Sequence, residues 1–225
     1  MTVAAVILAA HHGNALREVE GVANARRLAE VAWAGGAVPI VVVAPDPDGS
    51  VAGALAGSEA VLATPAPDEA GPAGQMARGA RVAGDLVSDT TAVLLWPARM
   101  GWADAETVTT LIEAHGRDPG SLLRPAYGGT AGWPALLPAA YLDALEAVGP
   151  KPMPAAVLDT LVTGGMPLGL VEVGDPGTVH DLDTPRAQLP PFEGPPEPAA
   201  GHQHEWGAEV AEGPDADPEP PTTVG

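Results

Sequence analysis

Two carboxylates separated by one residue form the pattern in this sequence that most directly suggests chemistry. They are Asp181 and Asp183, with Leu182 between them. Side chains two residues apart in an extended segment point to the same side, so both carboxylates would face one ligand. Such a pair could bind a divalent metal ion or an acceptor molecule. A turn in which an aspartate bonds the backbone ahead of Thr184 and Pro185 explains the same residues equally well.

Imidazole and guanidinium side chains follow two apolar runs and suggest contact with an anion. His11 and His12 could contact a phosphate or a metal, and a loop without such a role explains them too. Arg99 could clamp an anion, could stand in for a metal by placing a fixed cation near phosphate, or could pair with a nearby acid. Asp104 is better explained as the residue that caps a helix.

The elements that must position these residues alternate between apolar strands and amphipathic helices. Short apolar runs predict strands buried on both faces, and apolar residues three and four apart predict helices. The predicted strands are 3–10, 38–44, 60–63, 91–96 and 167–173, and the predicted helices are 24–33, 75–86, one that begins after residue 104, 138–148 and 154–163. This alternation predicts an α/β fold with a mostly parallel sheet covered on both faces. Ligands would bind beyond the carboxyl ends of the strands.

Three tryptophans fall in segments expected at that edge of the sheet. They are Trp96, Trp102 and Trp133, in a chain with only 4% aromatic residues. Their rings could stack on a base or a pterin-like ring, or they could fill a cleft that binds nothing. The sequence leaves both alternatives open.

Composition and charge exclude several classes of protein. The net charge of −19, from 10 basic and 29 acidic residues, argues against a nucleic-acid-binding surface. The absence of cysteine excludes disulfide scaffolds and thiol nucleophiles. No apolar run approaches the roughly 20 residues of a membrane helix, and no basic leader precedes the first run. We therefore expect an acidic, cytoplasmic protein with neither a nucleic-acid nor a membrane partner.

The composition changes after Arg186. From Ala187 onward the sequence contains no basic residue and is rich in proline and acidic residues. This composition is typical of a disordered tail. The predicted organisation is a folded domain over 1–187 and an acidic tail over 188–225, and the tail is a candidate segment for binding a protein partner.

Five segments, in order, resemble the MobA-like nucleotidyltransferases, especially the molybdenum-cofactor cytidylyltransferases. They are the opening strand 3–10, the Gly-rich stretch 71–79, the strand and helix 93–112, the segment 125–137 with its Tyr-Gly-Gly and Trp-Pro, and the closing segment 175–185 with Asp-Leu-Asp-Thr-Pro. The closing segment is the most specific of the five. The resemblance covers almost all of the folded part and implies a three-layer Rossmann-like nucleotidyltransferase fold.

The resemblance implies that the protein joins a nucleoside triphosphate to a phosphorylated small molecule, either molybdopterin-like or another acceptor, and releases pyrophosphate. Asp181 and Asp183 would bind Mg²⁺. The positions that match the family's nucleotide-binding segments are Ala9, Ala10, His11, Gly13, Arg17, Gly79 and Arg99. No residue is assigned a catalytic role.

The chain departs from the family pattern at two places. His11 stands where the family's first glycine lets the backbone approach phosphate, and the loop contains no lysine. Trp96, Pro97 and Arg99 lie where the family has a metal-binding aspartate after its central strand. These departures support an alternative, a catalytically inactive relative that serves as a protein-binding scaffold or regulatory partner.

Overall fold

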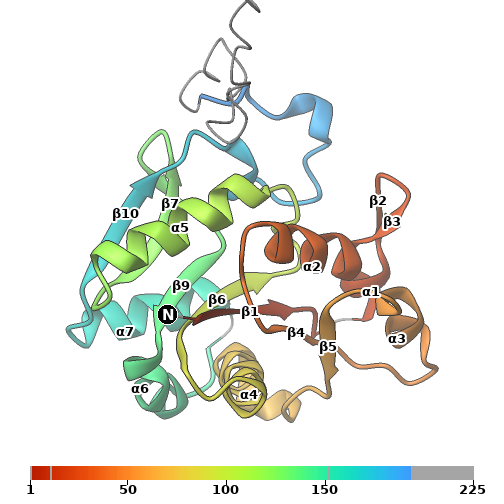
Figure 1. Cartoon of the computed structure of the whole chain (residues 1–225), viewed down its shortest axis with the longest axis horizontal. Coiled ribbons are helices and arrows are strands. Elements are labelled where there is room, and N and C mark those ends of the chain that lie inside the picture. Colours follow the sequence, from red (N-terminus) through yellow and green to blue (C-terminus); the bar gives the residue numbers. More distant parts are fainter. Residues whose placement is uncertain (1, 11, 152, 194–225) are drawn as a thin grey trace, which may run out of the picture. The chain divides into compact units, whose positions relative to one another are not determined.

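The computed structural model describes residues 2–10, 12–151 and 153–193 (Figure 1). Contacts with the domain continue past Arg186. The amide of Glu193 donates to the carbonyl of Gly174 at 2.8 Å, and the Tyr127 hydroxyl donates to the carbonyl of Pro191 at 3.2 Å. The folded part therefore extends beyond the sequence-based boundary at residue 187, and the predicted acidic tail lies, from residue 194 onward, outside the described residues.

One eight-stranded sheet forms the centre of this domain, in the order β10-β7-β9-β6-β1-β4-β5 with β8 paired to β7 (Figure 1). β1 pairs in parallel with β4 and β6, and β4 with β5 and β7 with β10 do the same. β9 runs antiparallel to both of its neighbours, β6 and β7. The expected α/β fold with a mostly parallel sheet is confirmed. The strands are β1 (Thr2–Leu8), β2 (Glu18–Val19), β3 (Val22–Ala23), β4 (Ile40–Val43), β5 (Ala60–Ala63), β6 (Thr90–Pro97), β7 (Leu122–Tyr127), β8 (Thr130–Ala131), β9 (Ala135–Pro138) and β10 (Leu168–Glu172).

Helices cover both faces of the sheet, which gives three layers (Figure 1). α2 and α5 pack on one face, and α4, α6 and α7 pack on the other. None of the helices in the described part of the chain is long and apolar enough to cross a membrane. The helices are α1 (His12–Leu16), α2 (Asn24–Ala34), α3 (Ser50–Leu55), α4 (Gly71–Leu86), α5 (Ala105–Arg117), α6 (Leu142–Ala147) and α7 (Pro154–Thr163), with short 3-10 turns at Asp68–Ala70, Ala139–Tyr141, Pro176–Thr178 and Arg186–Gln188.

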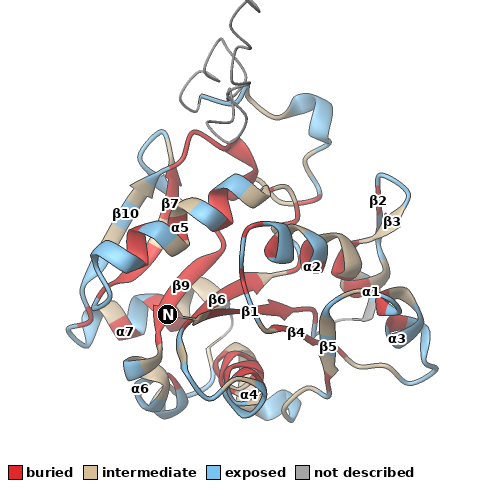
Figure 2. Cartoon of the chain, viewed as in Figure 1, coloured by how far each residue is buried: buried red, intermediate tan, exposed pale blue. Residues whose placement is uncertain are grey.

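β1 is buried on both faces because its side chains alternate between two apolar clusters. Ala5 and Ile7 belong to the cluster under α2, and Ala4 and Val6 belong to the cluster under α4. Buried residues are concentrated in the sheet and on the inward faces of the helices (Figure 2). Each large apolar side chain buried in this way stabilises the fold by about 1.5–3 kcal/mol. The continuous apolar pattern of the first strand therefore fixes its place in the middle of the sheet.

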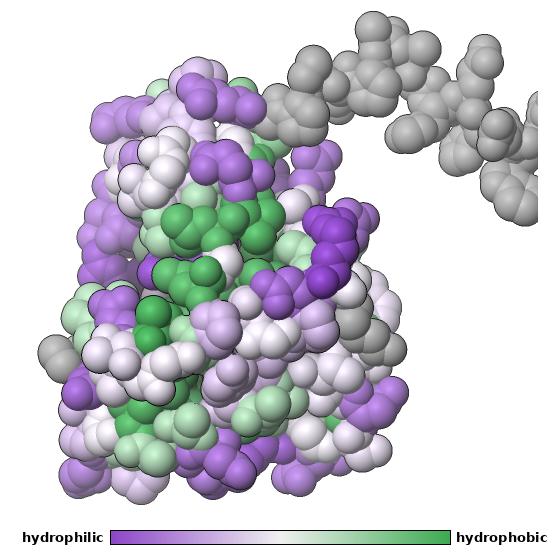
Figure 3. All heavy atoms as spheres, turned by 90° about the vertical axis from the view of Figure 1, so that its left-hand side faces the viewer, coloured by the Kyte–Doolittle hydropathy of each residue, from purple (hydrophilic) through white to green (hydrophobic). Residues whose placement is uncertain are grey.

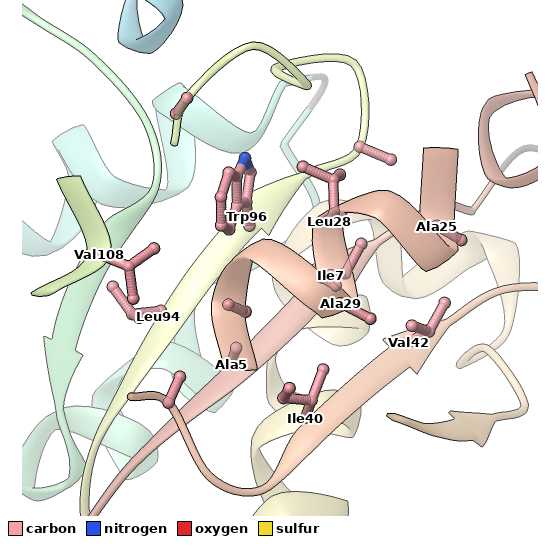
Figure 4. Close-up of a cluster of buried hydrophobic side chains, with 14 of the residues drawn as sticks. Ala5, Ile7, Ala25, Leu28, Ala29, Ile40, Val42, Leu94, Trp96 and Val108 are labelled. Atoms are coloured by element: carbon pink, nitrogen blue, oxygen red, sulfur yellow. The ribbon is translucent and has the colours of Figure 1, made fainter. Parts of the chain in front are cut away.

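Trp96 is part of the first cluster rather than part of a ligand surface. Its side chain is fully buried, and its indole N–H donates to the carbonyl of Met100 at 2.7 Å. Figure 4 shows the ring on the side of the sheet that α2 covers, near Leu28 and Leu94. A ligand cannot stack on this ring in the described conformation.

The sequence pattern predicted β1, β4, β5, β6 and β10 and most of the helices, but neither β7 nor the antiparallel β9. β7 contains Pro125, and β9 follows Pro134 and ends at Pro138. Proline lacks the N–H that a strand donates, so these segments do not have the pattern of central strands. The predicted helix 138–148 begins instead as the end of β9, followed by a 3-10 turn and α6. The order of the sheet around β9 became visible only in three dimensions.

A buried carboxylate fixes the segment after β10 onto the start of α5. Asp175 accepts hydrogen bonds from the amide of Gly177 at 2.7 Å and from the Thr107 hydroxyl at 2.9 Å. It also accepts one from the amide of Asp104, whose own side chain caps α5. Burial, and to a smaller extent the nearby charge of Asp104, raise the pKa of Asp175 above its ordinary range. The closing segment is thus attached to the loop that precedes α5.

The edge strand β10 carries exposed apolar side chains. Leu168 and Leu170 are 44% and 51% exposed, and β7 is the strand to which β10 pairs. Figure 3, which views the molecule from the side of β10 and α7 in Figure 1, shows apolar side chains gathered on this face. Among the described residues, no further strand pairs with this edge.

We predict that Gly79→Ala destabilises the domain. Gly79 lies in α4 against β1, and a Cβ built there would lie 2.2 Å from Cγ1 of Val6. The helix would have to move away from the sheet, which costs about 1–3 kcal/mol of the free energy of unfolding. Urea unfolding followed by circular dichroism measures this change.

Gly84→Ala is the matched control on the same helix. A Cβ at Gly84 has nothing within 4 Å, so this change should leave stability equal or raise it by up to about 1 kcal/mol through helix propensity. Equal unfolding midpoints for the two variants would contradict the close packing of α4 on β1.

Asp175→Asn should change how stability depends on pH. The raised pKa of Asp175 means that the folded protein keeps a proton which the unfolded chain releases. The contribution of Asp175 to the free energy of unfolding therefore falls as pH rises from the unfolded pKa, about 3.9, through the raised folded value. The stability difference between the protein and the variant should be largest near pH 4 and shrink toward neutral pH. Urea unfolding at several pH values tests this, with the exposed Asp85→Asn on α4 as the control for loss of one carboxylate. A difference that grows with pH would contradict it.

Candidate functional site

The loops that follow β1, β6 and β10 meet at the carboxyl edge of the sheet. β1 and β6 are adjacent and in register, with Leu8 opposite Pro97, and the amide of Ala98 donates to the carbonyl of Leu8 at 2.9 Å. The segment after β10 joins them where the amide of Leu182 donates to the carbonyl of Arg99 at 2.9 Å. This edge is where a parallel α/β sheet binds its ligands.

Four charged side chains from these three loops form what we call the Arg–Asp cluster: Arg17, Arg99, Asp181 and Asp183. Nη2 of Arg99 lies 2.8 Å from Oδ2 of Asp181 and 2.6 Å from Oδ2 of Asp183. Nη1 of Arg17 lies 2.9 Å from Oδ1 of Asp183. The structure thus joins residues far apart in the sequence, and one guanidinium lies between the two carboxylates.

The stretch that carries the two carboxylates is a turn, not an extended strand. The amide of Asp183 donates to Oδ1 of Asp181 at 3.0 Å, and the amide of Thr184 donates to the carbonyl of Asp181 at 3.0 Å. Leu182 between them is buried beside Gly101. The turn interpretation of this motif is confirmed, and both carboxylates nevertheless reach Arg99.

The charges of the cluster alter the protonation equilibria of its members. The hydrogen bond from Arg17, followed by the charge of Arg99, lowers the pKa of Asp183 below its ordinary range. The hydrogen bond to Asp181, followed by the charge of Asp183, raises the pKa of Arg99. Both shifts favour the charged forms of Asp183 and Arg99.

Further contacts fasten the loop after β1 to the closing segment. Nη2 of Arg17 also donates to the carbonyl of Leu182. Glu20, at the tip of the β2–β3 hairpin, accepts a hydrogen bond from Nη1 of Arg186 at 2.6 Å and lies 3.9 Å from Nε of Arg27. The hairpin is thus tied to the chain that follows the two aspartates.

Three side chains, those of Trp102, Arg27 and Asn24, support the cluster from below. The indole N–H of Trp102 donates to the carbonyls of Asp181 and Thr184, and the guanidinium of Arg27 lies over its ring at 5.7 Å. Asn24 is fully buried and its amide donates to the carbonyl of Ala98 at 2.7 Å. Trp102 was considered as a platform for a base, but its N–H is used to hold the turn.

The predicted nucleotide-binding positions do not all lie together. Ala10 and Gly13 are exposed at the start of the loop after β1, and a Cβ on Gly13 would meet nothing within 4 Å. Ala9 is buried, and its amide donates to the carbonyl of Val43, so that N–H is not available to a phosphate. Gly79 lies in the helix–sheet interface, against Val6 and Val43. His11 lies outside the described residues.

Trp133 also differs from the role considered for it. It is only 8% exposed and lies under the guanidinium of Arg124 at 5.2 Å from the ring centre. Burial raises the cost of the Arg124 charge and lowers the pKa of that group. Trp96 and Trp133 therefore fill the interior, which is the second of the two alternatives that the sequence left open.

The described residues do not fit a divalent cation at this edge. Mg²⁺ requires oxygen ligands in octahedral geometry, but the Asp181 and Asp183 carboxylates already bond guanidinium groups on their outward oxygens. No group of three or more metal-binding side chains occurs among the residues that the structure describes. The side chain of Asp104 caps α5 by accepting from the amide of Thr107 at 3.1 Å. We therefore assign no metal ligands here.

Two cavities of the described domain lie elsewhere. One, of about 410 Å³, is lined by the loop after β5 and by Arg78 and Arg81 of α4. The other, of about 450 Å³, lies between α6 and α7 and is lined by Tyr141, Leu161 and Met166. The Arg–Asp cluster contributes to neither, and the side chains of Arg17, Arg99 and Asp183 are 45%, 56% and 63% exposed.

Sequence reasoning named all four members of the cluster and Trp102, but not Asn24 or Glu20. Asn24 reads as an ordinary residue at the start of a helix, and nothing in its neighbourhood indicates that it joins the loops after β1 and β6 through Asn14 and Ala98. The pairing of Glu20 with Arg186 is equally hidden. These two residues lie far apart in the sequence, and only the fold shows that they are neighbours.

The domain has the fold of several solved nucleotidyltransferases. It is similar to a nucleotidyl transferase from Methanothermobacter thermautotrophicus, with 19% identity, a TM-score of 0.63, and coverage of 76% of this chain and 87% of that one. It is also similar to 2-C-methyl-D-erythritol 4-phosphate cytidylyltransferase from Thermus thermophilus, with 18% identity, a TM-score of 0.59, and coverage of 82% and 94%. A third similar structure is Rv0371c from Mycobacterium tuberculosis in complex with manganese, with 18% identity, a TM-score of 0.59, and coverage of 76% and 88%.

A comparison with curated proteins finds no match. The family model described as the MobA-like NTP transferase domain matches residues 5–162, which is more than half of the chain. This range contains the second half of β1, all of β6 and the loops that carry Arg17 and Arg99. The chain therefore belongs to the MobA-like NTP transferase family.

Proposed function

We propose that this protein binds a nucleoside triphosphate at the carboxyl edge of its sheet and transfers the nucleotide to a phosphorylated small molecule. The acceptor would be molybdopterin-like or another phosphorylated compound. The observation that carries the proposal is the convergence of Arg17 and Arg99, from the loops after β1 and β6, around the closing Asp-Leu-Asp motif. Two guanidinium groups with fixed positive charge suit the phosphates of a nucleotide.

Within this proposal the residues of the first loop contact the triphosphate. The open space around Gly13 and the exposure of Ala10 leave room for phosphate above the loop. Arg17 would exchange part of its bond with Asp183 for a bond to a phosphate oxygen. His11 and Gly79 stay predictions from the family pattern. Of the proposed contacts, those of Arg17 and Arg99 have the strongest support, because both are exposed and charged.

Mg²⁺ is the cation that the family resemblance implies for the reaction. Since the outward carboxylate oxygens of Asp181 and Asp183 bond arginines, we route no step of the proposed transfer through Mg²⁺. The residues of this chain contribute binding and orientation: the guanidinium groups attract and place the phosphates, and the buried turn around Leu182 fixes the carboxylates. The location in the cytoplasm, where triphosphates are available, stays a prediction.

A second candidate is a catalytically inactive relative that acts as a scaffold or regulatory partner. Its support is the same pairing of Asp181 and Asp183 with arginines, which leaves the carboxylates engaged within the protein. The protein partner would bind the acidic tail, whose composition motivates this idea and most of which lies outside the described residues. Loss of a captured partner after removal of residues 188–225 would support this candidate, whereas capture of none by either form would count against it.

Calorimetric titration with CTP, GTP and ATP, each with and without Mg²⁺, tests the proposed function. We expect binding of one triphosphate, and a rise in the melting temperature that grows with its concentration. At 100 times the dissociation constant this binding stabilises the protein by about 2.7 kcal/mol. If none of these triphosphates binds, the nucleotidyltransferase proposal fails and the second candidate takes its place.

Arg17→Ala should weaken binding of that triphosphate by about 10- to 100-fold, the effect of losing one charge-assisted hydrogen bond. Arg17 is 45% exposed, so the variant is expected to fold. Arg117→Ala, which removes an exposed arginine at the end of α5 outside the cluster, is the control. Equal affinities of Arg17→Ala and the unmodified protein would remove Arg17 from the site.

A further inference from the structure

Arg99 has an unusual position between two carboxylates of one turn. A single nitrogen, Nη2, lies within 2.8 Å of Asp181 and within 2.6 Å of Asp183. This is the arrangement that a bridging cation would have, with the positive charge supplied by a side chain. The guanidinium is covalently attached to the chain, unlike a metal ion, and an arginine side chain stays charged at every physiological pH.

All four oxygens of the two carboxylates are engaged. Three accept hydrogen bonds from Arg17 or Arg99, and the fourth, Oδ1 of Asp181, accepts the amide of Asp183. Two positive groups balance two negative ones, so the cluster offers a divalent cation no net attraction. A metal ion would have to displace Arg99 and tolerate its positive charge nearby.

The rest of the fold holds Arg99 in this place. The amide of Leu182 bonds the carbonyl of Arg99 itself, and the indole of Trp102 bonds the carbonyls on both sides of the turn. The backbone of the arginine and the backbone of the aspartate turn are therefore attached to each other. The ion pairs form between segments that are already adjacent, so their loop-closure cost is small.

We propose that the Arg99 guanidinium is a built-in replacement for a divalent cation at this site, so that ligand binding at the Arg–Asp cluster does not require a metal. The proposal rests on the proposed function for the nature of the ligand, an anionic nucleotide. Whether Arg99 replaces a metal ion can be tested on the protein without a nucleotide.

The first experiment measures Mn²⁺ binding to the full-length protein by electron paramagnetic resonance. We expect the unmodified protein to have no Mn²⁺ site that depends on Asp181. Asp181→Asn should therefore leave any Mn²⁺ binding unchanged. Arg99→Ala should increase the affinity for Mn²⁺ by about tenfold or more, because it removes a positive charge a few ångströms from both carboxylates. Arg99→Lys keeps the charge and should show no gain. Arg117→Ala, at the exposed end of α5, controls for the general change in net charge.

Two results of this experiment would overturn the proposal. One is a Mn²⁺ site in the unmodified protein that Asp181→Asn abolishes. The other is an Arg99→Ala variant whose affinity for Mn²⁺ equals that of Arg117→Ala. Arg99 is 56% exposed on its side chain, so these variants should fold, and urea unfolding checks that they do.

The nucleotide titration separates this proposal from the proposed function. An affinity for the bound triphosphate that is the same within about twofold in EDTA and in Mg²⁺ supports metal-free binding. Binding seen only with Mg²⁺ would overturn it while leaving the proposed function in place. If no triphosphate binds in either condition, the proposed function fails, and the Mn²⁺ measurement alone decides whether Arg99 replaces a cation.

Discussion

The backbone hydrogen bonds of β1 are the constraint on which the rest of this domain depends. β1 has apolar side chains on both faces, so its N–H and C=O groups have no access to water and must be paired by β4 and β6. Parallel pairing in register places Leu8 opposite both Val43 and Pro97, and the chain therefore leaves the sheet at neighbouring points. Arg17 and Arg99 meet because their loops begin side by side, not because of any local preference of the two arginines.

The stability of the closing segment rests on buried contacts rather than on the charges that it displays. Leu182 is 5% exposed beside Gly101, and Asp175 accepts three hydrogen bonds at the start of α5. Exposed ion pairs such as those of Arg99 contribute little to stability, because solvent screens their charges. The ion pairs of the cluster therefore contribute little to the stability of the fold. Its charges can be rearranged by a ligand at little cost to the fold, which suits a binding surface better than a structural bridge.

This edge of the sheet is where the features that define the fold can be told apart from the charged residues that would carry the chemistry. The apolar pattern builds the sheet and its helices, and the similar solved structures share the fold at below 20% identity. The charged groups on the loops are free to change without disturbing that pattern, since function resides in sites carried by a fold. An arginine that occupies the space between two carboxylates is such a change. Under this proposal the positive charge at the site comes from the Arg99 guanidinium instead of a metal ion.

The sequence by itself determined five of the parallel strands, most of the covering helices, the cap at Asp104 and the identity of the four charged residues of the cluster. Continuous apolar runs and helical spacing are local signals, and a chain of this kind has few ways to bury them. The sequence could not determine that β9 reverses, that Trp96 and Trp133 are interior, or that Gly79 packs closely against Val6 of β1. Nor could it determine which acid pairs with Arg99. Those outcomes depend on which surfaces meet after folding, and residues far apart in the chain are brought together only by the tertiary structure.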